Sequence, residues 1–470
     1  MATNNFSNRH EPPIEIADSV GFHLYGDLHL HLSLGAATEP RKADQYLEIL
    51  QEYADIAAAV VATSRGLFIF EVQGERIHLF LDRPDRTDET ISELIDFCTY
   101  FTRSVYRKIA PKAGDDFGGF CMATDFGRAI ILNSGRQGDA SLISLGNPAN
   151  QPAKRLSRSP QVKAGHLAIK TRDGWEEINL RDRPLSSEKE NRSRTIEESL
   201  ARMAMNPAAN HVLFSKAADI VDTTSATIGS PRMVQGYAMR IDLDGFTKRV
   251  EHAFAENSRE QISNLVKEFL QILKIPAAFE EAVDRPLIRL PWAGDCYNAI
   301  FLLKPYEIYE DMTKSLAATL PQVWFDKEGR LHRDPSLAAV ADRQKWSIGV
   351  AGGQESQGRM LVANITTPHR QFLVSGGWAM RGSLDAQNAS GLRADETAIH
   401  VEDYRGLNDH YKGAFQSWEG GPTQYRKATS AALAKASKER TAAAPFITQV
   451  APRLPALATV PLRPYGEIWD

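Results

Sequence analysis

The chain has 470 residues and a formal net charge of −4. This length exceeds one ordinary hydrophobic core, so we expect two or three domains. The slight acidic excess argues against a dedicated nucleic-acid-binding protein, which would carry a basic excess. The three cysteines are too few for a disulfide framework, and none lies in a CxxC pair, so we expect neither disulfides nor a structural zinc site.

The chain shows no sign of export or membrane insertion in its sequence. Its first residues, MATNNFSNRHEPPIEIADS, are polar and lack the basic-then-apolar order of a signal peptide. No apolar run approaches the roughly 18 residues that a membrane-spanning helix needs. We therefore expect a soluble cytoplasmic protein without a membrane or nucleic-acid partner.

Hydrophobic periodicity in the first part of the chain predicts alternating strands and helices. In chain order, we expect a strand at 28–34, a helix at 43–61, two strands within 67–81, a helix at 88–109, and strands near 119–122 and 129–132. The turn between the paired strands falls at residues 73–75. This order is that of a ferredoxin-like sheet with helices on one face.

A charged segment separates this part from the next. Residues 181–194 (RDRPLSSEKENRSR) contain almost no large apolar side chains, which is typical of a linker. A short helix is predicted at 196–205. We therefore place a first domain at residues 20–180 and a charged connector at 181–232.

The strand and helix pattern then restarts. In order, we expect a strand at 237–243, one broken helix or two within 246–273, a hairpin within 287–303, a helix at 306–316, and strands at 347–351 and 360–365. Both halves therefore follow one plan, which predicts an internal duplication and an α+β fold of two ferredoxin-like domains. We place the second domain at 233–410 and a tail, rich in Ala, Lys and Pro, at 411–470.

Two acidic residues stand at strand ends in the second half. Asp242 ends a predicted strand and is followed by a Gly-Phe-Thr turn that opens a helix, and Asp295 lies at the tip of the predicted hairpin. Backbone N–H groups at a helix start suit phosphate, and paired carboxylates suit two Mg²⁺ or Mn²⁺ ions. Two such ions can activate an attacking hydroxyl and neutralise a leaving pyrophosphate. The structural alternative is that Asp242 caps the helix and Asp295 is a turn residue.

Residues 242–247 (DLDGFT) and 294–297 (GDCY) resemble the class III nucleotide cyclases, the family of adenylate and guanylate cyclases. In that family an Asp-Ile-x-Gly-Phe-Thr strand end is followed by a Gly-Asp hairpin. The resemblance implies that Asp242, Asp295 and the Leu243 carbonyl bind two metal ions. The residues that it places against the nucleotide are Gly245, Phe246, Thr247 and Gly294.

The family also has an Asn and a basic residue, four positions apart, after a Gly near the end of the domain. In the second half, Met380 and Leu384 fall at these positions. The first half has a matching segment at 145–156 (LGNPANQPAKRL), in which Asn150 takes the Asn position and Lys154 the basic position, with Arg155 one step on. The resemblance implies that these side chains hold ribose and the transition-state phosphate. Their structural alternative is a polar turn followed by a solvated helix.

The first half in turn lacks the expected acids. Its hairpin reads Gly74-Glu75, and its first strand offers His29 and His31 in place of Asp. Each half thus has what the other lacks, so we predict a pseudo-heterodimer with one complete site between the halves. The soluble, doubled form resembles the pyrimidine cyclases of bacterial Pycsar antiphage systems, whose product activates a separate cyclic-nucleotide-binding effector.

The base is predicted from two positions of the family pattern. Adenylate cyclases read adenine with a Lys and an Asp, and here Glu71 and Ile143 stand at those positions, which disfavours adenine. A carboxylate at Glu71 suits a base edge that presents an N–H group, so we expect UTP as substrate and cyclic UMP as product. Cytidylate cyclase, guanylate cyclase and a non-catalytic nucleotide-binding homologue remain alternatives, and the chain is expected as a monomer or homodimer.

Overall fold

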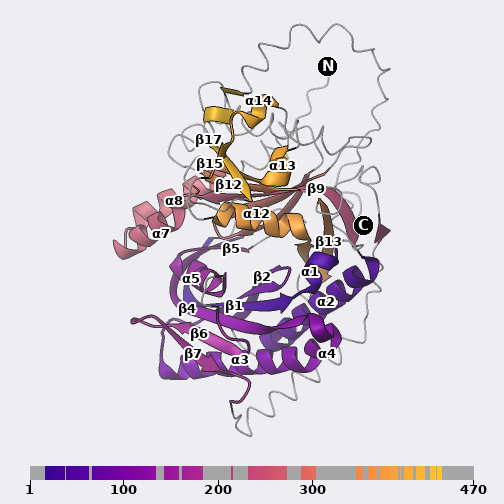
Figure 1. Cartoon of the computed structure of the whole chain (residues 1–470). Helices are drawn as coiled ribbons and strands as arrows, with labels where there is room; N and C mark the ends of the chain where they lie inside the picture. Colours follow the sequence, from indigo (N-terminus) through magenta and orange to yellow (C-terminus); the bar gives the residue numbers. More distant parts are fainter. Residues whose placement is uncertain are drawn as a thin grey trace, which may run out of the picture.

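A computed structural model gives the fold (Figure 1). It describes residues 16–37, 39–62, 66–133, 142–157, 161–183, 213–214, 231–272, 287–302, 346–352, 358–367, 371–389, 392, 396–405, 409–418, 424–429, 431–433 and 435–436. The predicted helices at 196–205 and 306–316 and most of the predicted connector lie outside these ranges.

The first half is built on one mixed sheet. Along the sheet the strands run β2 (Leu67–Gln73), β3 (Arg76–Asp82), β1 (Ile16–Leu30), β4 (Phe117–Asn133), β6 (His166–Lys170) and β7 (Trp175–Asn179), and β5 (Leu142–Leu145) pairs with β4. Strand β1 is antiparallel to both β3 and β4, and β6 runs parallel to β4. The predicted ferredoxin-like strand order is therefore confirmed.

Helices cover both faces of this sheet. They are α1 (Leu32–Gly35), α2 (Pro40–Ala62), α3 (Asp88–Lys108), α4 (Ala110–Ala113), the short 3₁₀ helix η2 (Gly114–Asp116) and α5 (Asn147–Ser157). Leu24 and Leu28 of β1 share a core with α2 and α3, whereas Tyr25 packs with Leu156 of α5. Because neighbouring strand residues point to opposite faces, α5 lies on the face opposite α2 and α3. The two helices predicted at 43–61 and 88–109 therefore lie on one face as expected, and α5 is an additional helix on the other face.

Two predicted strands differ from the structure. Strand β1 ends at Leu30 and residues 32–35 are helical, so the predicted strand at 28–34 covers only the end of a much longer one. Strand β4 is one continuous strand where two short ones were expected. It pairs with β1 along nearly all of its length, and this ladder keeps residues 123–128 extended despite their weak apolar signal.

The second half repeats this plan. Its sheet runs β10 (Leu287–Ala293), β11 (Cys296–Leu302), β9 (Arg232–Leu243), β12 (Trp346–Ala351), β15 (Glu396–His400), β17 (Tyr425–Thr429) and β16 (Gln416–Ser417). Strand β13 (Arg359–Thr366) pairs with β14 (Gln371–Gly376) and with the start of β9. Strand β8 (Leu213–Phe214) also pairs with the start of β9. The helices are α7 (Phe246–Ala255), α8 (Arg259–Ile272), α12 (Trp378–Asn388), α13 (Val401–Arg405) and α14 (Asp409–Lys412). The sheet thus extends to Thr429, past the predicted boundary at 410.

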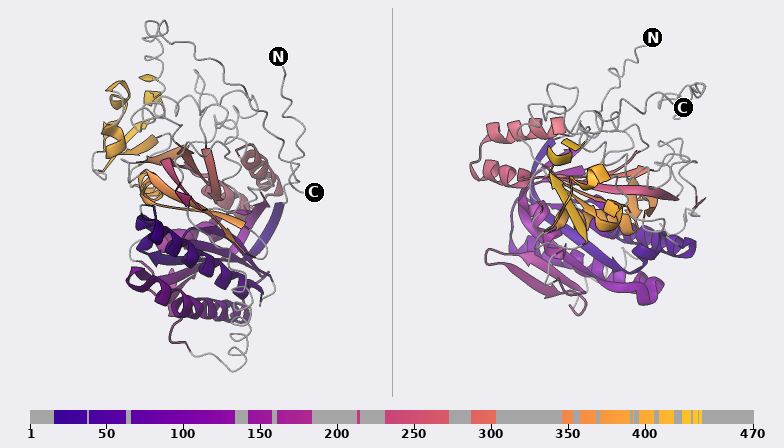
Figure 2. Two further views of the ribbon diagram at one scale, coloured as in Figure 1. Left: turned by 90° about the vertical axis from the view of Figure 1, so that its right-hand side faces the viewer. Right: turned by 45° about the horizontal axis from the view of Figure 1, so that its top comes forward.

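The two halves exchange hairpins. The β13–β14 hairpin of the second half contributes Leu361, Ile365 and Phe372 to the core that contains α2 and α3 of the first half. The β4–β5 hairpin of the first half contributes Leu132 and Ile143 to the core under α7 and α8. Each half therefore completes the other's core, and the two sheets face each other with α12 between them (Figures 1 and 2).

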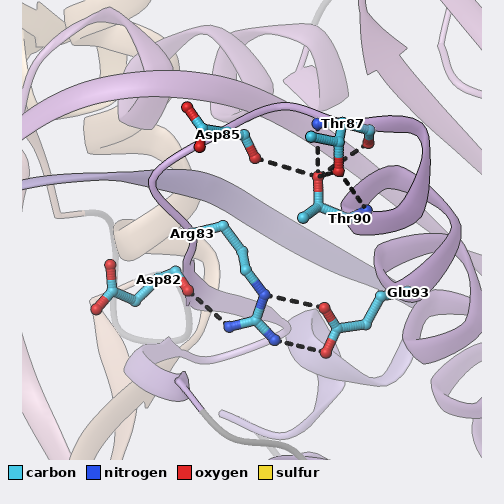
Figure 3. A network of polar contacts seen from close by, with 6 residues as sticks. All are labelled: Asp82, Arg83, Asp85, Thr87, Thr90 and Glu93. Carbon is cyan, nitrogen blue, oxygen red and sulfur yellow. Dashed lines mark hydrogen bonds and ion pairs between the residues drawn. The ribbon is translucent and has the colours of Figure 1, made fainter.

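The loop that leads into α3 shows how one helix is anchored (Figure 3). Thr87 caps the helix: its hydroxyl accepts from the Thr90 amide at 3.2 Å, and its own amide donates to the Thr90 hydroxyl at 2.9 Å. These bonds satisfy donors that a helix start leaves unpaired. Arg83 holds Glu93 with two hydrogen bonds, of 2.9 and 2.5 Å, which fixes the end of β3 to the helix.

Within the described ranges, no helix is both long enough and apolar enough to cross a membrane.

Candidate functional site

The two predicted metal-binding acids lie side by side in the second half. Asp242, near the end of β9, is the register partner of Cys296, the residue that follows Asp295 in the β10–β11 turn. The Leu243 amide donates to the Asp295 carbonyl at 3.3 Å, which ties the strand end to the turn. The backbone thus brings Asp242 and Asp295 together, as the sequence motif predicts.

The acid pair lies in a region where negative charge is costly. Burial is the main cause that raises the pKa of Asp242 from 3.8 to about 7, and the charges of Asp295 and Asp244 add to it. Lys154 and Arg240 act in the opposite direction. At neutral pH the carboxylates therefore gain from any further positive charge that binds between them.

The first half reaches this site through Asn150, near the start of α5. Its Nδ2 donates to the Thr247 hydroxyl at 2.6 Å, and that hydroxyl donates to Asp295 Oδ2 at 2.8 Å. A methyl group added at Gly294 would lie only 3.1 Å from Asn150 Oδ1, so the amide rests against the turn itself. Asn150, Thr247 and Asp295 form a chain of contacts that joins the two halves.

Lys154 and Arg155 are neighbours in sequence, but they have different surroundings. Lys154 is exposed, and its charge lowers the pKa of both Asp242 and Asp295. Arg155 donates to Glu177 of β7 at 2.6 Å in a half-buried ion pair. Lys154 is therefore the cation of α5 that lies within electrostatic reach of the acids.

The start of α7 forms the floor of the site. Gly245 has φ +73° and precedes the helix, and a methyl group added there would meet nothing within 4 Å, so the space before the helix is open. The amide groups of the first turn have no partners within the helix, which suits a phosphate. The Phe246 side chain is fully buried against Phe269, with ring centroids 5.2 Å apart. Only the backbone of Phe246 can therefore meet a ligand.

The donor set fits divalent cations of the Mg²⁺ or Mn²⁺ type. Asp242 and Asp295 offer hard carboxylate oxygens, and burial raises the pKa of both. A bound cation would relieve that cost. The Leu243 side chain is buried in the core, so its backbone is what remains for a metal. No group of three or more His, Cys, Asp or Glu that could hold a metal occurs among the described residues.

The two predicted base-reading positions differ in their surroundings. Ile143 is fully buried in the core beneath α7 and α8, so its side chain cannot meet a nucleotide. Glu71 is buried on β2, opposite His78 of β3. Burial raises the pKa of Tyr25, and the charge of Glu71 adds to this shift. Tyr25 stacks on His78, with ring centroids 4.1 Å apart. Glu71 is therefore part of a buried aromatic and histidine cluster.

Three charged residues near the two acid pairs were not predicted from the sequence. Arg240 of β9 and Asp244, just after the end of β9, lie two residues on either side of Asp242, and the charges of both affect its pKa. The alternation of side chains along a strand would have indicated them. In the first half, Asp27 pairs with Arg76 as Asp242 pairs with Cys296. Asp27 therefore stands at the position of the first acid, and the prediction that His29 and His31 replace this acid is wrong.

The residues of α12 that were predicted to match Asn150 and Lys154 of α5 also need a correction. Gly146 and Gly377 precede α5 and α12 with φ values of +142° and +127°. Counting from these glycines, Arg381 and Asp385 match Asn150 and Lys154, rather than Met380 and Leu384. The Arg381 Nε and Asp385 Oδ2 atoms are 3.6 Å apart and exposed. The second half therefore carries an Arg–Asp pair where the first carries Asn and Lys.

The Thr247→Val variant is expected to weaken Mn²⁺ binding by about 10-fold, because the hydroxyl that orients Asp295 is lost while the shape is kept. Asn150 would lose its partner at the same time. Isothermal titration of Mn²⁺ into the purified protein measures the effect. Thr247→Ser keeps the hydroxyl and should bind nearly as wild type does. Equal affinity for the Val variant and wild type would contradict the role of the hydroxyl.

No protein-family model matches this chain, and no curated protein matches it. Among solved structures, a class III adenylyl cyclase-like ATP-binding protein from Pseudomonas aeruginosa is similar over 90% of both chains, with a TM-score of 0.67 and 16% identity. The adenylyl cyclase CyaB from P. aeruginosa covers 43% of this chain and 95% of its own, with a TM-score of 0.29 and 12% identity. The first likeness shows that the chain has the class III cyclase-like fold in both halves.

Proposed function

We propose that this chain is a nucleotide cyclase that converts UTP to 3′,5′-cyclic UMP and pyrophosphate. The observation that carries the proposal is the chain of contacts from Asn150 through Thr247 to Asp295, which joins groups of both halves in one site. At this site the second half supplies the acids Asp242 and Asp295, and the first half supplies the amide of Asn150 and the charge of Lys154. The fold shared with the cyclase-like protein from P. aeruginosa supports the same reaction class.

Each group then has a chemical task. The ribose 3′-oxygen attacks the α-phosphorus, the bond from that phosphorus to the bridging oxygen breaks, and pyrophosphate leaves while the 3′-hydroxyl proton passes to water. Two divalent cations at Asp242 and Asp295 would supply Lewis-acid charge when bound. Lys154, whose charge acts on both acids, would offset charge on the phosphate. The Asn150 amide, which contacts Thr247, would orient the ribose, and the open backbone at Gly245 would receive phosphate oxygens.

The base preference rests on Glu71. A buried carboxylate accepts hydrogen bonds, and uracil presents an N3–H donor, whereas adenine presents an acceptor at N1. The aromatic faces of Tyr25 and His78 lie beside this carboxylate. We infer that cyclic UMP would act as a messenger on a separate cyclic-nucleotide-binding effector in defence against phage.

The Glu71→Gln variant is expected to lower kcat/KM for UTP relative to CTP by about 10-fold or more. The reason is that the amide replaces a charged acceptor for uracil N3–H and adds a donor for cytosine N3. Competition between UTP and CTP in one reaction, with both products quantified, measures the ratio. An unchanged ratio in a variant with normal total turnover would remove Glu71 from base selection.

The direct test is incubation with each of ATP, GTP, CTP and UTP in Mn²⁺, with the products identified by mass. Cyclic UMP as the main product supports the proposal, and cyclic CMP or cyclic GMP would keep the reaction but change the base. The Asp242→Ala variant is the control for contaminating activity.

A second candidate is nucleotide binding without turnover. It is favoured by the name of the similar P. aeruginosa protein, which describes an ATP-binding cyclase-like protein. This alternative predicts saturable binding of a triphosphate with no pyrophosphate release in Mn²⁺, and ATP would compete with UTP. The complete set of groups from both halves favours the cyclase.

A further inference from the structure

The first half contains a second acid pair in its strand β1 and its β2–β3 turn. Asp27 of β1 is the register partner of Arg76, the residue that follows Glu75 in the turn. The Leu28 amide donates to the Glu75 carbonyl at 2.9 Å, which ties the strand end to the turn. Gly74 precedes Glu75 and has φ +58°.

These relations repeat those of the site in the second half, residue by residue. The corresponding residues there are Asp242, Cys296, Asp295, Leu243 and Gly294, and the last has φ +63°. The surroundings also match. A methyl group at Gly74 would lie 3.4 Å from the Ser375 carbonyl, and one at Gly294 would lie 3.7 Å from the Ser144 carbonyl. Ser375 and Ser144 each stand two residues before the glycine that precedes α12 or α5, so each turn faces the exchanged hairpin of the other half.

The turn acid is Glu75 in the first half and Asp295 in the second. The difference that changes the local charge is the residue after the turn acid. In the second half it is Cys296, and burial raises the pKa of this thiol, which keeps it uncharged. In the first half it is Arg76, whose Nη2 donates to Asp27 Oδ2 at 3.0 Å and to the Ser157 hydroxyl at 3.1 Å. A positive charge is therefore built into the chain beside Asp27, where Asp242 has none at the same register position.

The negative charge of Asp27 is balanced by nearby positive groups. Burial would raise the pKa of Asp27, but Arg76 and His29 outweigh it and lower the pKa to about 2. His29 Nε2 lies 3.7 Å from Asp27 Oδ2. Asp242 shows the opposite shift in the matching frame. Arg76 is thus a hydrogen-bonded counterion of Asp27, whereas burial still raises the pKa of Glu75 to about 7. At the second-half pair, the cations that lower the pKa of Asp242 are Lys154 and Arg240, which lie at other positions.

Three polar atoms at the first-half pair have no hydrogen-bond partner among the described residues. They are Glu75 Oε1, Arg76 Nε and the hydroxyl of Tyr53, a fully buried residue of α2. Burial is the main cause that raises the pKa of the Tyr53 hydroxyl. The charges of Asp27 and Glu75 add to this shift and Arg76 opposes it, so the hydroxyl lies in the same cluster. Buried polar groups are normally paired. The unpaired oxygens of Glu75 and Tyr53 are therefore available as ligands for a cation beside the Arg76 guanidinium.

We propose that Asp27 and Glu75 form a latent divalent-cation site, and that the Arg76 guanidinium takes the place of the cation there. The chain then needs metal at only one of its two symmetry-related acid pairs. The inference stands on the repeated backbone frame and does not depend on the reaction proposed above.

The test uses the full chain with Asp242→Asn and Asp295→Asn, so that the second-half acids are removed as metal ligands. In this background we expect no Mn²⁺ uptake at millimolar Mn²⁺, measured by electron paramagnetic resonance of the free ion. Adding Arg76→Cys restores the residue found at the matching position, and about one Mn²⁺ per chain should then bind. A further Asp27→Asn change should abolish this uptake. Because the readout is metal bound to the first half, it is independent of turnover.

The matched control is Arg83→Cys, which also removes an arginine paired with a carboxylate of the same half (Figure 3). No Mn²⁺ uptake should appear in it. A folded Arg76→Cys protein that binds no Mn²⁺, or equal uptake in the Arg83 control, overturns the proposal. Should Arg76→Cys fail to fold without metal, the Arg76→Met and Asp27→Asn double variant, in which both charges are gone, must fold. If it also stays unfolded, Arg76 is not a counterion and the proposal is wrong.

Discussion

The Asp242→Asn variant is expected to be more stable than wild type in the absence of metal, and nearly inactive. The amide removes a negative charge from a position where burial raises the pKa of the carboxyl from 3.8 to about 7. At pH 8 the gain in the free energy of unfolding should be about 2–4 kcal/mol. Turnover should fall about 1,000-fold or more, because metal contributes several kcal/mol to the transition state.

The stability of the metal-free protein should depend on pH because of the raised pKa of Asp242. The folded state holds the Asp242 proton more tightly than the unfolded state, so the stability due to the protonated form is complete below about pH 4. It is lost as the pH rises towards 7. Wild type without metal should therefore become less stable over this range, and Asp242→Asn should show a flatter profile. Mn²⁺ should stabilise wild type most above pH 7, since it binds the carboxylate form.

Urea titrations at several pH values, with EDTA or with Mn²⁺, measure these changes. The control is Asp55→Asn, because the pKa of Asp55 on α2 is also raised by burial, but this residue lies outside the site. It should keep full turnover and Mn²⁺ stabilisation. A loss of stability in Asp242→Asn without metal would contradict the electrostatic account of the acid pair.

The second large effect is expected at Lys154. The Lys154→Met variant should lower kcat/KM by about 100-fold, because its charge reaches both acids and would lie near the reacting phosphate. The stem of the side chain keeps its apolar length, so the helix should fold as before. Initial rates at several UTP concentrations in Mn²⁺ separate the loss in kcat from any change in KM.

Arg155→Met is the matched control, since it removes one positive charge from the adjacent position of the same helix. Arg155 is held by Glu177 of β7, so its loss should lower stability and leave kcat/KM within a few-fold of wild type. Equal losses of activity in the two variants would mean that α5 as a whole, rather than the Lys154 charge, supports the reaction.

The sequence was most informative where chemistry and local structure coincide. The strand end at Asp242 and the turn at Asp295 could be predicted because a short motif specifies both the backbone and the acids. The order β2, β3, β1, β4 in the first half could be predicted because periodicity marks parts of these strands and the helices between them. These two features are local, so no knowledge of the other half was needed.

What could not be predicted depends on contacts between distant segments. Nothing near Ile143 indicates that its side chain enters the core of the other half, and this placement removes it from base reading. The match of Asp27 to Asp242 depends on register, which a shift of one residue would invert. Phe246 falls within the motif, but the packing of its ring against Phe269 follows only from the tertiary structure.

The exchanged hairpins also bear on how the protein behaves at low concentration. An enzyme whose site forms between two separate subunits loses specific activity on dilution, because the subunits dissociate. Here the groups from both halves belong to one chain, and strands of each half complete the core of the other. Opening the interface would expose both cores, so it amounts to unfolding. Activity per molecule should therefore stay constant on dilution. The activity of this chain cannot be regulated by separating its two halves.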